Sequence, residues 1–127
     1  PTTCSPWQKF FSQYEYDFHF TCLGEMTGLN YLGGRVKDIL SAVELLSQNC
    51  PDIHLEARGQ GGVPALIAAV LSDKIKSIKL VDIPESWESM LLPLIPDAEK
   101  SARACMIDGI MSYFDLADLK ELVTVVK

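Results

Sequence analysis

The sequence predicts an α/β fold with three layers, in which helices cover both faces of a partial parallel sheet. Residues 53–57 (IHLEA) alternate apolar and polar side chains, as a half-buried strand does. Residues 58–62 (RGQGG) turn the chain, residues 63–71 form an apolar, Ala-rich helix, and residues 77–82 (SIKLVD) form a second strand. Because a strand–helix–strand unit is right-handed, the two strands should run parallel.

Length and composition limit the possible classes of protein. The chain has 127 residues, about one domain, and 48% of them are hydrophobic, which favours a folded core over disorder. The net charge of −6 argues against a nucleic-acid partner, which needs clustered basic residues. No apolar run reaches the roughly 18 residues of a membrane span. We expect residues 1–127 to form one domain, or a portion of one, with a loose arm at residues 1–8.

Two helices are predicted before the first strand. Aromatic and apolar residues recur at three- and four-residue steps over residues 10–25, which favours a helix. The alternative for this segment is a strand around residues 14–20, because aromatic residues also suit strands. Residues 35–48 carry apolar side chains on one face and charged side chains opposite, and Pro51 marks the end of that helix.

Three helices and one strand are predicted after the second strand. Short helices are expected at residues 87–92 and 116–122, the latter capped by Asp115. Residues 99–114 are amphipathic enough to form a longer helix, although Gly109 within them weakens it by about 1 kcal/mol. The β-branched run at residues 123–126 (VTVV) suits a third strand.

The predicted sheet is small. Two or three strands are fewer than the roughly five or six of an average sheet. A parallel sheet is usually covered on both faces, and the helices at residues 35–48 and 63–71 are expected to provide that cover. The chain begins with Pro1, which suits an excised or processed product. We therefore expect either a fragment, or a domain whose sheet is completed by a neighbouring domain or by a homo-oligomer.

The cysteines and histidines do not form a recognisable metal motif. Cys4, Cys22, Cys50 and Cys105 are widely spaced, without a C-x-x-C pair, and the chain has two histidines. We expect structural thiols, with Cys22 and Cys105 on apolar helical faces, and neither a metal nor a cofactor. Two disulfides are an alternative whose connectivity the spacing does not select.

The glycine-rich turn can be compared with three functional templates. A dinucleotide fingerprint requires G-x-G-x-x-G, but Pro64 stands at the third glycine. A phosphate-binding P-loop requires G-K-[ST], which does not follow the turn. The nucleophile elbow G-x-S-x-G fits residues 57–61 best in spacing, with Gly59 at the position of the serine. The simplest reading is a tight turn between a strand and a helix.

Several short motifs, in the same order, resemble bacterial acetyl xylan esterase-like α/β-hydrolases. They are residues 35–40 (RVKDIL), the turn at residues 58–62, the Ala68-Ala69 helix and residues 111–119 (MSYFDLADL). The similarity extends over roughly residues 23–122. It implies an α/β-hydrolase-like core, an ester-cleaving ancestry on acylated plant polysaccharide, and export. In that family the core carries an elbow serine, an acid after a later strand, and a histidine near the C-terminus.

The resemblance does not extend to the catalytic residues. Gly59 occupies the position of the serine and has no nucleophilic atom. Gln60 matches the residue whose backbone N–H helps to form an oxyanion hole, and that N–H does not depend on the serine. Asp82 follows a strand, which makes it a candidate for the acid, although a strand-end Asp is more often a turn or capping residue.

No predicted base completes this set. The histidine should follow the serine and the acid in chain order, but His19 and His54 both precede the turn. We expect both to be packing or surface residues. Ser86 is the nearest hydroxyl after a strand and is expected to serve as a loop or cap residue.

The sequence therefore favours an α/β-hydrolase-like domain without catalysis, which binds a ligand or supports an adjacent domain. The expected ligand is a carbohydrate or an acyl ester. The alternative is part of an active carboxylic-ester hydrolase that acts on acylated polysaccharide, with an unconventional nucleophile and the remaining catalytic residues outside this chain.

Overall fold

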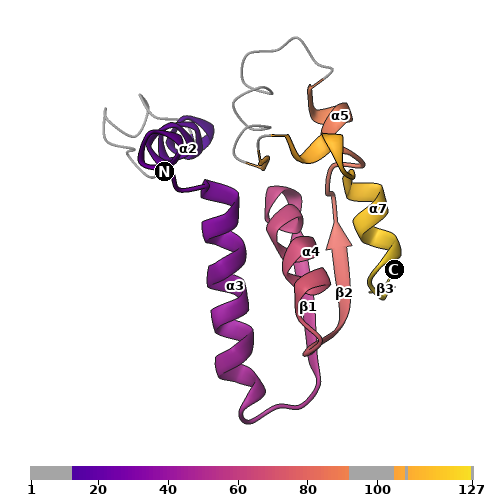
Figure 1. The fold of residues 1–127 in the computed structure, drawn as a ribbon. Coiled ribbons are helices and arrows are strands. Elements are labelled where there is room, and N and C mark those ends of the chain that lie inside the picture. Colours follow the sequence, from indigo (N-terminus) through magenta and orange to yellow (C-terminus); the bar gives the residue numbers. More distant parts are fainter. Residues whose placement is uncertain (1–12, 92–104, 108, 127) are drawn as a thin grey trace, which may run out of the picture.

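The structure, a computed structural model, describes residues 13–91, 105–107 and 109–126, without the side chains of residues 13–19 and 91 (Figure 1). Helices and strands alternate through its middle part. In chain order the elements are α2 (Gln13–Thr27), α3 (Tyr31–Ser47), β1 (Ile53–Arg58), η1 (Gly59–Gly61), α4 (Gly62–Leu71), β2 (Ile75–Val81), α5 (Trp87–Leu91), η2 (Ile110–Ser112), α7 (Leu116–Glu121) and β3 (Val125–Val126).

The sheet is parallel, and its strand order is β1-β2-β3. Arg58, the last residue of β1, pairs with Val81, the last residue of β2. Lys79 of β2 pairs with Val126 of β3. The predicted α/β class, the parallel β1–α4–β2 unit and the third strand are therefore confirmed. Both principal strands end at the same level, so the turns that follow them lie at one edge of the sheet.

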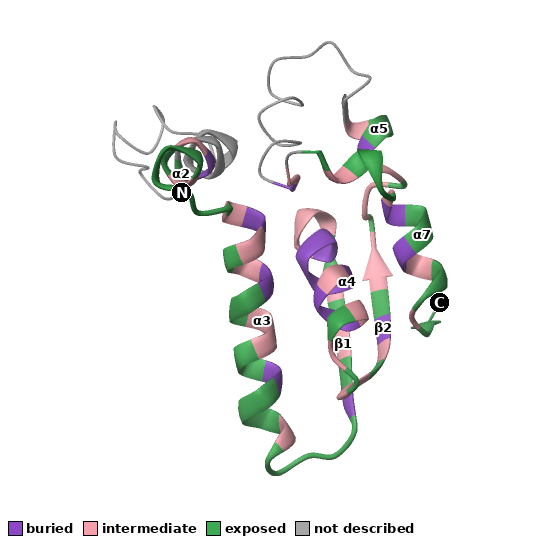
Figure 2. Cartoon of the chain, in the orientation of Figure 1, coloured by how far each residue is buried: buried purple, intermediate pink, exposed green. Residues whose placement is uncertain are grey.

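The prediction that helices cover both faces is wrong for the described residues. Ile39 of α3 and Ala65 of α4 pack in one cluster with Leu55 and Ile78, so both helices lie on the same face of the sheet. Figure 2 shows the buried residues concentrated along α4. The opposite face, called here the outer face, carries the polar positions of the alternation and comprises His54, Glu56, Ser77 and Lys79. Polar side chains at alternate positions suit contact with water.

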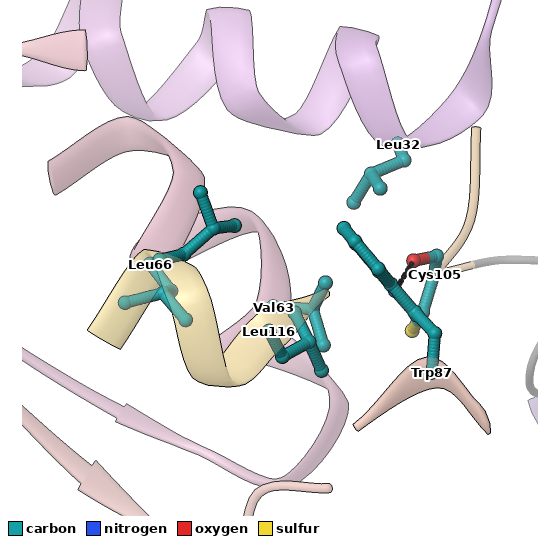
Figure 3. Packing of buried hydrophobic residues seen from close by; sticks show 7 residues of the cluster. Leu32, Val63, Leu66, Trp87, Cys105 and Leu116 are labelled. Carbon is teal, nitrogen blue, oxygen red and sulfur yellow. Dashed lines mark hydrogen bonds between the residues drawn. The ribbon is translucent and has the colours of Figure 1, made fainter. Parts of the chain in front are cut away.

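A second apolar cluster joins the helices beyond the carboxyl end of the sheet. Trp87 of α5 is fully buried, and its indole Nε1–H donates to the carbonyl of Cys105 at 2.7 Å (Figure 3). Leu32 of α3 and Val63 of α4 are also fully buried in this cluster. The buried members are Leu32, Val63, Leu66, Trp87, Cys105, Leu116 and Leu119. This cluster ties α3, α4, α5 and α7 into one unit.

The N-terminal half contains the predicted helices with shifted ends. The helix predicted at residues 10–25 is α2, so the alternative strand at residues 14–20 is wrong. α3 begins at Tyr31, four residues earlier than predicted, because the Asn30 side chain caps it and accepts from the Gly33 N–H at 2.7 Å. The predicted loose arm at residues 1–8 lies outside the described residues.

The long helix predicted at residues 99–114 is wrong where the structure describes it. Residues 105–107 and 109–114 form turns and the short 3-10 helix η2. Gly109 has a φ of +78°, a left-handed conformation that interrupts an α-helix. Residues 99–104 lie outside the described residues. The predicted helix that follows is confirmed as α7, with Asp115 as its N-cap.

Within the described part of the chain, no helix combines the length and the apolar character that crossing a membrane requires.

Candidate functional site

The turn after β1 is the centre of the candidate site. β1 ends at Arg58 in extended conformation, and Gly59 follows with a φ of +56°. The chain then makes one 3-10 turn, and α4 begins at Gly62. The strand, sharp turn and helix predicted at residues 53–71 are therefore present, and Gly59 stands directly after the carboxyl end of a parallel strand. A left-handed residue at this point reverses the chain within three residues, which suits glycine.

Two glycines of the turn have different surroundings. A Cβ atom at Gly59 would meet no other atom within 4 Å, so the space that a side chain would enter is open. A Cβ atom at Gly62 would lie 2.2 Å from Cγ2 of Ile83. Gly62 therefore allows the first turn of α4 to pack directly against the segment that follows β2. This contact fixes the start of the helix relative to the sheet.

Asp82 lies at the corresponding point of the neighbouring strand. Arg58 and Val81 are paired, so Gly59 and Asp82 are the next residues on the two strands. Asp82 is exposed and has a φ of +52°, the single non-glycine residue with a positive φ among those described. The structure thus brings both predicted site residues to one edge of the sheet. Aspartate tolerates the left-handed region better than most residues, which accounts for its place in this turn.

Buried residues support the turn at Gly59–Gly61, which is called the elbow from here on. The thiol of Cys105 lies 3.9 Å from the carbonyl oxygen of Gln60 and donates to it, and Cys105 is fully buried. The Gly62 N–H also donates to the Gln60 carbonyl. These contacts fix the peptide that follows Gln60. The role predicted for the backbone N–H of Gln60, donation to an anion, stays a prediction.

The contacts that join Cys105, Trp87 and Asp115 could not be predicted from the sequence. Trp87 donates through its indole N–H to Cys105, and its backbone N–H donates to Oδ1 of Asp115 at 2.8 Å. Nothing in the spacing of these residues indicates that they meet, because they belong to three separate segments. The one available signal was Asp115 as a helix cap, and that prediction is confirmed. Cys105 itself lies in a turn, and not on the helical face that was predicted.

His54 does not lie at this edge. His54 is the second residue of β1, five residues before Gly59, so the two are separated by about 16 Å along the strand. The ring of His54 lies on the outer face, with Nδ1 2.6 Å from Oγ of Ser77. His54 is therefore a surface residue, one of the two possibilities predicted for it. His19 lies in α2, and its side chain is outside the described residues.

Ser86 is a helix cap, as predicted. The Ser89 N–H donates to Oγ of Ser86 at 2.9 Å, and the Ser86 N–H donates to Oγ of Ser89 at 3.3 Å. This reciprocal pair satisfies backbone groups at the start of α5. The hydroxyl of Ser86 is thereby engaged in the local structure at the start of α5.

Two cavities lined by described residues lie away from the elbow. One, of about 200 Å³, opens between the end of α4 and the amino end of β2, where Ser72 and Asp73 line it. The other, of about 480 Å³, lies on the outer face beside His54 and Lys79. Neither includes Gly59, Gln60 or Asp82 in its lining. A ligand at Gly59 and Asp82 would therefore lie outside both of these cavities.

Cys22 and Cys50 are free thiols, whereas the thiol of Cys105 donates to Gln60. Cys22 is half-buried, Cys50 is exposed and Cys105 is buried, while Cys4 lies outside the description. Over residues 13–91, 105–107 and 109–126, His, Cys, Asp and Glu form no group of three or more that could hold a metal ion.

The structure provides a glycine turn and an exposed carboxylate at one edge of the sheet, with the buried thiol of Cys105 against the turn. Comparison with protein-family models, with curated proteins and with solved structures finds no match for this chain.

Proposed function

We propose that this chain is an α/β-hydrolase-like unit whose elbow contacts a ligand and does not attack it. The observation that carries the proposal is the conformation of Gly59, which stands at a φ of +56° directly after a parallel strand, where a nucleophile elbow has its serine. Glycine at this position keeps the turn and removes the reacting atom. The position of His54, about 16 Å from Gly59 along β1, supports the same conclusion.

The resemblance to acetyl xylan esterase-like proteins indicates the class of ligand. We propose a carbohydrate that bears acyl esters, bound at the edge formed by Gly59 and Asp82. The exposed carboxylate of Asp82 can accept hydrogen bonds from sugar hydroxyls. Because neither of the two cavities described above includes Gly59 or Asp82, we expect weak binding unless a neighbouring domain or a second copy covers this edge.

An NMR titration tests the binding proposal. An acetylated xylo-oligosaccharide is added to the ¹⁵N-labelled chain, and the amide resonances of Gly59, Gln60, Gly61 and Asp82 are followed. We expect these resonances to move together in a saturable way. The unacetylated oligosaccharide is the matched ligand, and a smaller shift with it would assign the acyl group a part in binding.

The variant Asp82→Asn provides the protein control, because it keeps the size of the side chain and the tolerance of a positive φ while removing the charge. Weaker binding by this variant is expected. Resonance changes confined to the outer face, or none at saturating sugar, would contradict binding at the elbow and leave a supporting role for an adjacent domain.

A second candidate is a latent ester-hydrolase site, which lacks its nucleophile in this chain, and the open space at Gly59 favours it. A serine side chain at this position would meet no atom within 4 Å of its Cβ. If an acid and a base are supplied by other parts of a longer protein, Gly59→Ser should create ester hydrolysis there, because a nucleophile would again be present. Gly61→Ser is the matched control, since its Cβ also has open space but its φ is −64°. Inactivity of a folded Gly59→Ser full-length protein would contradict this candidate.

A further inference from the structure

We draw no further inference here: the strongest candidate, the outer face of the sheet, where His54, Glu56, Ser77 and Lys79 line a cavity of about 480 Å³, carries no proposal because nothing in the structure shows what covers it.

Discussion

Three positions of the elbow illustrate what glycine contributes at the residue scale. Gly59 is required for its backbone conformation, since it has a positive φ and open space around its Cβ position. Gly62 is required for space, since a methyl group there would overlap Ile83. Gly61 has neither requirement, because its φ is −64° and no atom lies near its Cβ position. These separate reasons can be measured by single substitutions.

We predict opposite effects for alanine at Gly59 and at Gly61. Gly59→Ala should lower the free energy of unfolding by about 1–2 kcal/mol, because a Cβ atom is unfavourable in the left-handed region. Gly61→Ala should raise it by about 0.4–1 kcal/mol, because alanine reduces the freedom of the unfolded chain. Urea unfolding of the two variants measures both effects. Equal effects at the two positions would show that Gly59 does not adopt a positive φ.

At the scale of elements, Asp115 connects two helices. Its Oδ1 accepts from the Leu116 N–H at 2.6 Å and from the Trp87 N–H at 2.8 Å, so one carboxylate serves the start of α7 and the start of α5. Asp118 returns the capping interaction by accepting from the Asp115 N–H at 2.9 Å. Trp87 is itself a member of the buried cluster that supports the elbow. The stability of the elbow should therefore depend on a cap in a distant part of the sequence.

Substitution of Asp115 tests this connection. Asp115→Ala should lower the free energy of unfolding by about 1–3 kcal/mol, because it removes a helix cap and the bond to Trp87. Asp115→Asn keeps an amide oxygen as acceptor and should lose less than half as much. Both are measured by urea unfolding. A loss for Asn as large as that for Ala would indicate that charge, and not the two hydrogen bonds, is what Asp115 contributes.

The secondary-structure elements also show where the local sequence is sufficient to predict the structure. The segment from β1 to β2 was predictable because alternation, a glycine turn and an apolar helix agree there. The segment at residues 105–114 was not predictable. Its apolar residues recur at helical spacing, but they pack against Trp87 and the other helices from turns and a short 3-10 helix. Gly109 was recognised as unfavourable for a helix, and in the structure it has a left-handed φ of +78°.

At the scale of the whole molecule, the described sheet has one helix-covered face and one polar face. The sequence predicted a parallel sheet correctly. Helices on both faces were expected because parallel sheets are usually covered on both sides, and that expectation was wrong. The polar residues at alternate positions of β1 and β2 were visible in the sequence and indicated the exposed face. Gly59 and Asp82 lie at one edge of the sheet because each follows a residue of the last strand pair, Arg58 and Val81. The supporting cluster around Trp87 could not be predicted, because it joins distant segments.

The most direct measurement of the central claim is pre-steady-state hydrolysis of p-nitrophenyl acetate by the unchanged chain. Because Gly59 has no attacking atom, we predict no burst of p-nitrophenol and no turnover above that of Gln60→Pro, a variant that removes the backbone N–H beside the elbow. Circular dichroism verifies that both proteins are folded. A burst that approaches one equivalent of product per chain, absent from the Gln60→Pro variant, would contradict the account.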